Sequence, residues 1–228
     1  MIMHKAIALS MLFYLVSYSA KSQLTIKDFK LCLDNSGNAD DSSGNGYNGN
    51  VNGATLTTDR FGNANNAYYF NGVNNYISIK PFSVNTFSLS CWICDSSINT
   101  TNLNGIISRL NATPYKGFEF RVEPDSTLML VCGTGNTWIQ PTTPFKLSDN
   151  AWYHVVATND NNMIKIYVNA NLIASYAFSN YADNNDSIVI GTRNPAVWNG
   201  GWYNGKIDDI RIYNRALNQQ EISYLATH

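Results

Sequence analysis

Two glutamates on one stretch of the chain are the first residues whose spacing could support catalysis. The segment 119–123 reads EFRVE, and alternation along a strand places Glu119, Arg121 and Glu123 on one face. Paired carboxyl groups are the groups that carry out glycoside hydrolysis, one of them as a general acid. Arg121 is expected to lower the pKa of both neighbours, which is the wrong direction for a general acid. A solvated strand face is the simpler interpretation, and a glycoside hydrolase stays the weaker alternative.

Asp208 is a second carboxylate that needs a chemical explanation. A strand over Ile207–Tyr213 would place Asp208 on the same face as Ile210 and Ile212. A carboxylate on an apolar face needs a cation or strong hydrogen-bond donors, because burying it without them is costly or shifts its pKa. Asp208 is therefore a candidate metal ligand. The alternatives are an exposed strand end and a carboxylate held by backbone N–H groups.

Aromatic residues gather in two segments that read as loops. Sugar-binding sites place flat rings at a rim, with amides nearby that hydrogen-bond to hydroxyls, and loops on a rigid scaffold often carry them. The segments 133–140, GTGNTWIQ, and 194–204, NPAVWNGGWYN, both combine rings with asparagines. Some of these rings could instead seal the core, as expected for Trp92 and Trp152 inside predicted strands. The candidate ligand-binding residues are Asn136, Trp138, Trp198, Trp202 and Tyr203.

The cysteines and the one central histidine give no catalytic or zinc motif. Four cysteines allow several disulfide pairings, which the sequence leaves open: Cys32, Cys91, Cys94 and Cys132. Cys91 and Cys94 form a CxxC motif within one predicted strand, where their thiols face opposite sides and cannot bind one zinc ion. Free, buried cysteines are therefore expected. His154 lies in no nucleophile motif and is expected to pack on a sheet face.

Composition limits the class of partner. The chain has 228 residues, 44% of them hydrophobic, which is enough for one sandwich-sized domain with a core. Its formal net charge of −1 argues against nucleic acid and anionic membranes as partners. Asn, Gly, Ser and Thr are frequent while Lys and Glu are scarce, which is typical of many turns joining short strands.

The N-terminus is typical of an export signal. An apolar run over residues 6–18 is followed by Ala20 and Ser22, small residues at the −3 and −1 positions of a cleavage site. The run is too short for a comfortable membrane span, although an uncleaved anchor is the alternative. We expect a signal peptide over 1–22 and one domain over 23–228. The protein would then be secreted or held at the cell surface, with no membrane span in its mature form.

The rest of the chain predicts short strands separated by Asn- and Gly-rich turns. A helix is expected only over Asn218–Thr227, where Asn218 suits the N-cap and Glu221 the third helical position. Many strands without helices between them predict an all-β, two-sheet antiparallel jelly-roll sandwich with a short C-terminal helix. The expected strands are Phe29–Leu33, Ala67–Phe70, Tyr76–Ile79, Phe87–Ile93, Gly105–Arg109, Gly117–Val122, Thr127–Cys132, Trp152–Thr158, Met163–Val168, Leu172–Tyr176, Ser187–Ile190 and Lys206–Tyr213.

Three segments resemble the bacterial laminin-G-like domains. Asp40–Ile79 is similar to their opening, Trp152–Ser175 to their central hairpin, and Gly205–Ile222 to their closing strand and helix. The resemblance covers essentially all of the chain after residue 22. It implies the concanavalin A-like lectin/glucanase jelly roll, in which two curved antiparallel sheets pack together. Two departures are Ala170, where the hairpin turn usually has Gly, and Arg121, which replaces the middle acid of the E-x-D-x-E strand of the glucanases.

Such domains often bind a structural calcium ion, and the resemblance implies one here. In a jelly roll the first and last strands commonly lie side by side, so the loop after Leu33 would emerge beside Asp208. Calcium takes about six to eight oxygen ligands, and glycines in this loop let carbonyls turn inward. The alternative is an ordinary loop rich in Asx turns. The expected calcium ligands are Asp41, Asn45, Asn48 and Asp208.

Taken together, the residues and the resemblance predict a secreted, noncatalytic recognition domain. Carbohydrate is the leading ligand class, because aromatic rings beside asparagines in loops are typical of sugar-binding sites. A structural or protein-adhesion module at the cell surface is the main alternative. The expected partner is thus a glycan or a cell-surface protein, and the expected cofactor is structural calcium.

Overall fold

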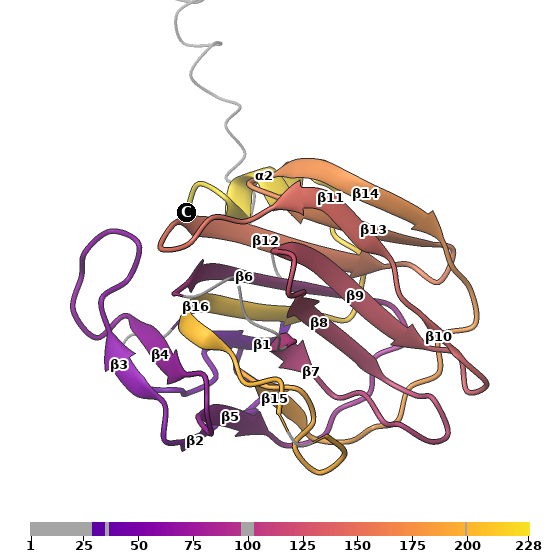
Figure 1. Ribbon diagram of the computed structural model, residues 1–228, viewed down its shortest axis with the longest axis horizontal. Coiled ribbons are helices and arrows are strands. Elements are labelled where there is room, and N and C mark those ends of the chain that lie inside the picture. The colour runs from indigo at the N-terminus through magenta and orange to yellow at the C-terminus, as the bar shows by residue number, and fades with distance from the viewer. Residues whose placement is uncertain (1–28, 35–36, 97–102, 199) are drawn as a thin grey trace, which may run out of the picture.

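The computed structural model describes residues 29–34, 37–96, 103–198 and 200–228 (Figure 1). The predicted signal peptide and its cleavage site lie outside these residues. The described chain forms two antiparallel sheets packed face to face, with a short helix after the last strand. This arrangement confirms the predicted all-β sandwich. No helix in the described ranges is long and apolar enough to cross a membrane.

Sheet A is built around the last strand. Its order is β14-β13-β12-β6-β16-β4-β3, and β1 also pairs with β16, next to the end of β4. Leu33 of β1 lies opposite Ile210 of β16, so the first and last strands are antiparallel neighbours as predicted. The strands are β1 (Phe29–Leu33), β3 (Thr55–Thr57), β4 (Ala67–Asn71), β6 (Phe87–Asp95), β12 (Trp152–Asn159), β13 (Met163–Val168), β14 (Asn171–Ala177) and β16 (Asn204–Tyr213).

Sheet B carries the candidate site on its outer face. Its order is β10-β9-β8-β7-β15-β5-β2, and β11 pairs with β9. In Figure 1 this sheet lies in front of sheet A, with β8 and β9 near its centre. The strands are β2 (Asn50–Asn52), β5 (Tyr76–Ile79), β7 (Asn104–Ser108), β8 (Phe118–Val122), β9 (Thr127–Gly133), β10 (Trp138–Ile139), β11 (Thr142–Lys146) and β15 (Ile188–Ile190).

The main core lies between the two sheets and follows strand alternation. Phe118 and Phe120 of β8 face Phe87 and Leu89 of β6, and all four side chains are fully buried. Burying each such side chain stabilises the fold by roughly 1.5–3 kcal/mol. The core therefore fixes which residues of each strand point outward, and so which residues can form a site.

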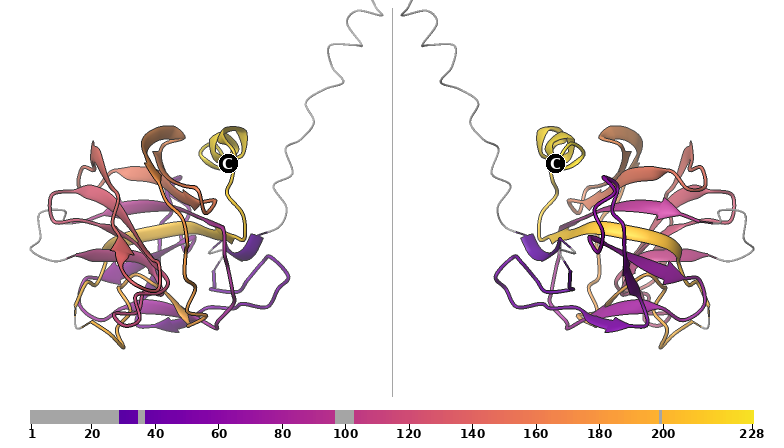
Figure 2. Two further views of the ribbon diagram at one scale, coloured as in Figure 1. Left: turned by 90° about the vertical axis from the view of Figure 1, so that its right-hand side faces the viewer. Right: turned by 90° about the vertical axis from the view of Figure 1, so that its left-hand side faces the viewer.

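The helix α2 (Gln219–Leu225) begins at the predicted cap. The Asn218 side chain accepts a hydrogen bond from the Glu221 N–H at 3.0 Å, and the Glu221 carboxylate accepts one from the Asn218 N–H at 2.8 Å. This reciprocal pair satisfies two helix N–H groups that have no partner within the helix. Figure 2 shows α2 against the outer side of sheet A. There it closes a second apolar cluster: Val156, Tyr167, Tyr213, Leu217, Ile222 and Leu225.

A β-bulge in β16 reverses the predicted face of Asp208. Asp208 lies opposite Trp92 of β6, whereas Arg211 lies opposite Ser90, so β16 has one more residue than β6 in this stretch. Asp209 absorbs the extra residue with a left-handed φ of 50°. Asp208 therefore points to the outer face, away from Ile210 and Ile212 in the core. The prediction that it shares their face was wrong.

The four cysteines are buried and free, as expected. Cys91 lies in the main core, whereas Cys94 lies outside that cluster, which agrees with side chains on opposite faces of β6. Burial raises the pKa of both Cys91 and Cys132 far above the ordinary thiol value. These thiols therefore act as small apolar side chains.

Candidate functional site

The loop between β15 and β16, described over 191–198 and 200–203 and called the 191–203 loop, lies over the outer face of sheet B. The Gly105 N–H of β7 and the Arg193 N–H both donate to the Gly201 carbonyl, which fastens the two ends of the loop to each other and to β7. Arg193 reaches across to Glu119 of β8, on the side opposite the core. Residues separated by more than seventy positions thus meet on one surface.

Glu119 lies at the centre of a buried ionic cluster under this loop. Its carboxylate is 2.6 Å from Arg121 Nη1 and 2.9 Å from Arg193 Nε, and the residue is 0% exposed. Arg121 also binds Glu123 at 2.5 Å. Burial alone would lower the pKa of Arg121, but the two carboxylates raise it above its usual value. The prediction of a solvated strand face was wrong, because the distant loop covers these charges.

This geometry gives no support to hydrolysis by the Glu119 and Glu123 pair. A general acid must reach the substrate and carry a proton near neutral pH. Glu119 reaches neither solvent nor a ligand, since both of its oxygens lie within 3.1 Å of Arg193 Nε. The two arginines match the two glutamates in charge, which makes the cluster a structural support for the loop.

Three aromatic rings lie in a row above the cluster. Trp138 of β10 contacts Tyr115 with ring centroids 5.2 Å apart, and it contacts Trp198 of the 191–203 loop at 5.9 Å. The Arg193 guanidinium lies 4.5 Å from the centre of the Trp198 ring, which ties the row to Glu119 below. The rings are inclined to one another by 81° and 53°, so they offer separate faces and no single flat platform. We call Tyr115, Trp138 and Trp198 the aromatic row.

The structure brings together only part of the predicted ligand-binding set. Trp138 and Trp198 meet, and Asn136 is exposed in the turn beside Trp138. Trp202 is half-buried and packs on Tyr76 of β5 at 6.0 Å. Tyr203 is 0% exposed and belongs to the main core, because consecutive residues at the end of the loop point to opposite sides. Tyr203 is therefore a core residue and is not placed to contact a ligand.

A cleft of about 380 Å³ lies next to the aromatic row. Asn111 connects two other residues of its lining: the Asn111 side-chain oxygen accepts from Asn194 Nδ2 at 3.3 Å, and Asn111 Nδ2 donates to Asp186 at 2.6 Å. No sequence pattern links these three polar residues, which come from separate segments of the chain. The residues that line the cleft are Tyr76, Asn111, Asp186, Ser187, Val189, Asn194, Pro195, Ala196 and Val197.

The loop expected to bind calcium is held by its own hydrogen bonds. Asp41 accepts from the N–H groups of Cys32 and Ser43 at 3.0 Å and of Tyr47 at 2.9 Å. Burial opposes ionisation, but these donors and the Ser43 hydroxyl lower the pKa of Asp41 below its usual value. Asn48 accepts from the Asp41 N–H at 3.0 Å, and Asn45 donates to the Ser43 hydroxyl.

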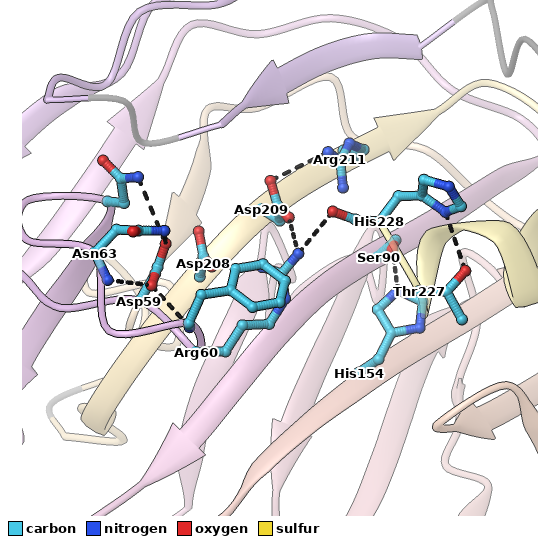
Figure 3. A network of polar contacts seen from close by, with 12 residues as sticks. Asp59, Arg60, Asn63, Ser90, His154, Asp208, Asp209, Arg211, Thr227 and His228 are labelled. Atoms are coloured by element: carbon cyan, nitrogen blue, oxygen red, sulfur yellow. Dashed lines mark hydrogen bonds and ion pairs between the residues drawn. The ribbon is translucent and has the colours of Figure 1, made fainter.

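Asp208 already has a cation beside it (Figure 3). Arg60 Nη1 lies 2.6 Å from Asp208, and Arg60 Nη2 lies 2.8 Å from Asp209 and donates to the His228 carbonyl at 2.9 Å. The guanidinium also lies 4.6 Å from the centre of the Trp92 ring. Burial and the Asp209 charge raise the pKa of Asp208 to about 7, although Arg60 opposes this.

The four predicted calcium ligands do not fit one shared site. Asp208 is bound by a guanidinium, while Asp41 is bound by N–H donors of its own loop. No three His, Cys, Asp or Glu side chains within the described ranges lie close enough together to hold a metal ion. Calcium binding stays a prediction, and Asp208 is not placed to take part in it.

His154 packs on the outer face of sheet A, as predicted. Its Nε2 lies 3.0 Å from the Ser90 hydroxyl, and its ring contacts Trp92 at 5.4 Å. Burial, with Arg211 and Arg60 nearby, lowers the pKa of His154 to about 3. The imidazole is therefore neutral and structural at physiological pH.

A family described as the concanavalin A-like lectin/glucanases superfamily matches residues 70–223. That range is more than half of the chain and contains the aromatic row and the cleft. The chain belongs to the concanavalin A-like lectin/glucanase superfamily. The matched range contains the hairpin and closing segments and the last residues of the opening segment, and it confirms the family that these segments resemble. A comparison with well-characterised protein sequences found no match.

Solved structures share this superfamily fold at low sequence identity. Domain 4 of AbnA, a GH43 extracellular arabinanase from Geobacillus stearothermophilus in complex with arabinotriose, has a TM-score of 0.72 and 22% identity, over 87% of this chain and 98% of that one. The botulinum neurotoxin serotype D binding domain has a TM-score of 0.68 and 19% identity, over 88% and 50%. The binding domain of Paraclostridial Mosquitocidal Protein 1 has 0.70 and 20%, over 87% and 52%. The chain spans about half the length of these two toxin domains, and the likeness establishes the fold.

Proposed function

We propose that this superfamily domain binds carbohydrate without cleaving it, through the aromatic row. The observation that carries the proposal is the contact of Tyr115, Trp138 and Trp198, which come from three separate segments and meet on one surface. Aromatic faces of this kind stack against the apolar faces of sugar rings. The solved domain 4 of AbnA with arabinotriose supports the same ligand class for this fold.

The ionic cluster supports a noncatalytic role. Arg193 stacks on Trp198 and is held by Glu119, so the cluster fixes a ring where a sugar could bind. A glutamate used in this way is a positioning residue. We therefore assign Glu119 to the support of the row, and no bond cleavage to the domain.

Binding of oligosaccharides to single variants tests the proposal. Arabinotriose and a panel of plant and host glycans would be titrated calorimetrically against the wild type, Trp138→Ala and Trp198→Ala. Each lost ring contact is expected to weaken binding about tenfold at most, corresponding to roughly 0.5–1.5 kcal/mol per aromatic contact. Phe61→Ala is the matched control, because Phe61 is exposed and lies beside Arg60 on the other sheet. A folded wild type that binds no glycan would refute the proposal and favour the protein-adhesion alternative.

We also propose that the domain acts outside the cytoplasm. We further propose that the Asp41 loop alone, without Asp208, binds calcium. Export is supported by the signal-like segment 1–22. Calcium binding is supported by the loop oxygens of Asp41, Asn45 and Asn48, and it would require the carboxylate to exchange N–H donors for the ion. Chelator should then lower the melting temperature of the wild type. Equal melting temperatures in calcium and in chelator would contradict a calcium site.

A further inference from the structure

The cleft beside the aromatic row is built from four segments that are distant in sequence. Tyr76 comes from β5, Asn111 follows β7, Asp186 precedes β15, and Asn194 to Val197 belong to the 191–203 loop. Its volume of about 380 Å³ lies within the range of small-molecule sites. The Val197 and Trp198 N–H groups both donate to the Asn194 carbonyl, so one tight turn forms a wall of the cleft and carries Trp198 of the row. The cleft and the row are therefore neighbours across a single turn.

The polar side chains of the cleft form a directed chain of hydrogen bonds. Asn194 Nδ2 donates to Asn111, and Asn111 Nδ2 donates to Oδ2 of Asp186 at 2.6 Å. Each amide is thereby fixed in orientation, because its donor and acceptor ends are both used. Asp186 is half-buried, and its second oxygen, Oδ1, has no hydrogen-bond partner in the part of the chain that the structure describes. The chain ends in an acceptor that a ligand hydroxyl could satisfy.

The cleft also has an apolar side. The Tyr76 ring is held by Trp202 at a centroid distance of 6.0 Å and an angle of 45°. Val189, Pro195 and Val197 line the space near it. One ring face, a few aliphatic groups and a fixed carboxylate are the features that bind a pyranose or furanose ring, which has apolar C–H faces and a rim of hydroxyls.

We propose that this cleft is a sugar subsite for an uncharged glycosyl residue, and that Asp186 makes it discriminate against acidic sugars. The inference rests on the proposed carbohydrate-binding function and extends it from the aromatic row to a second position. Asp186 accepts a hydrogen bond from a ligand hydroxyl, while the Tyr76 ring packs on a face of the sugar. A uronic or sialic acid would bring a second carboxylate against Asp186, and the two negative charges would repel each other. Arg193 of the adjoining turn does not offset this repulsion, because it is paired with Glu119.

Three variants separate the cleft from the row. Wild type, Asp186→Asn, Tyr76→Ala and Trp198→Ala would be titrated with neutral probes (arabino-, xylo- and cello-oligosaccharides) and with acidic probes (trigalacturonic acid and sialyllactose). All titrations would be run in chelator, so that a bound cation cannot stand in for the carboxylate. Melting temperatures would show that each variant is folded.

We expect the wild type to bind at least one neutral probe more tightly than every acidic probe. Asp186→Asn should weaken the neutral probe about tenfold, as for the loss of a hydrogen bond to a charged group, and reduce the preference over acidic probes. Tyr76→Ala should weaken binding of the neutral probe, because it removes the ring face that packs on the sugar. Two results would each overturn the inference: unchanged affinity for the neutral probe in Asp186→Asn, or tighter binding of an acidic probe than of every neutral one by the wild type. If only Trp198→Ala weakens binding, the cleft assignment fails while the proposed function stands; binding of no probe refutes both.

Discussion

Ala170 is one of the few residues whose conformation conflicts with its side chain. Asn169 and Ala170 connect β13 to β14, and their φ values of 47° and 64° form the left-handed pair of a tight hairpin turn. Asn tolerates this region, whereas the Cβ of Ala costs about 1–2 kcal/mol there. Ala170, where the family usually has Gly, therefore destabilises the folded hairpin, and the sequence pattern of the hairpin could not show this cost.

Ala170→Gly should stabilise the domain by up to about 1 kcal/mol, because relief of the left-handed strain exceeds the extra unfolded-state entropy of glycine. Chemical denaturation of both proteins would measure the difference. Ala177→Gly is the matched control at the extended end of β14, where the same substitution should destabilise by roughly 0.5–1 kcal/mol. Equal effects at the two positions would contradict the argument.

His154 makes a residue-scale prediction about acid. Its folded pKa of about 3 lies below the unfolded value, so between these values the unfolded chain binds more protons. Stability should therefore fall as pH decreases from about 6.5 toward 3. His154→Gln keeps a terminal amide near Ser90 and cannot gain this charge. The free energy of unfolding of this variant should therefore fall less over the same pH range than that of the wild type, and the two decreases should differ by a few kcal/mol at most. Denaturation midpoints at pH 7 and pH 4 give the comparison, and parallel curves for the two proteins would exclude this role.

At the scale of elements, Arg60 is the link between the 58–66 loop and the bulge of β16. Its guanidinium lies between two neighbouring carboxylates, Asp208 and Asp209, and its side chain is only 7% exposed. A folded pKa of about 7 means that Asp208 takes up a proton in the folded state more readily than in the unfolded chain. Its contribution to stability is therefore full at low pH and is lost as pH rises through 7.

Arg60→Met should destabilise the domain by roughly 3 kcal/mol, because it leaves the buried Asp208 without its cation and Asp209 with Arg211 alone. The loss should be larger at pH 8 than at pH 5, since protonation of Asp208 relieves the repulsion at the lower pH. Lys206→Met is the control: Lys206 is half-buried and binds Thr58 of the same loop from the same strand, but this hydrogen bond is exposed and its acceptor is uncharged. Its substitution should change stability by about 0.5 kcal/mol or less. A pH-independent loss for Arg60→Met would contradict the assignment to Asp208.

The sequence predicted the regular elements well and the irregular ones poorly. All twelve expected strands and the capped helix are present, because their alternation and cap residues are local signals. The strands β2, β3 and β10 were missed because two or three residues show no alternation, and β11 contains Pro144, which cannot donate to a ladder. The bulge at Asp209 has no comparable local signal, so the face of Asp208 could not be predicted.

The candidate site was predictable only in part, because its residues are far apart in the sequence and their contacts leave no local pattern. Trp138 and Trp198 were chosen by residue type and loop context, and they meet. The burial of Glu119 depends on Arg193, 74 positions away, and no pattern within β8 reports that contact. Tyr76 and Asp186 were missed in the same way, since each is an ordinary strand or turn residue until the fold assembles the cleft.

At the scale of the whole molecule, export gives a prediction that mass spectrometry can check. Cleavage after Ser22 would leave Gln23 as the first residue of the secreted protein. A mature protein that retains Met1 would contradict a cleaved signal and favour an uncleaved anchor. Replacement of Ala20 by Arg should block processing, because the site needs a small residue, while Lys21→Arg between the two small positions should not.

The position of β16 within sheet A sets the order in which the domain can assemble. This strand pairs with β1, β4 and β6, so three strands that leave the ribosome early have no neighbour on one edge until residues 204–213 have been synthesised. Contacts between such distant segments make folding slow, and the nascent chain must stay soluble meanwhile. Sheet A therefore cannot close around its central strand before residues 204–213 have been synthesised. If the chain is exported as proposed, this late closure would leave the polypeptide unfolded enough to pass through a membrane pore.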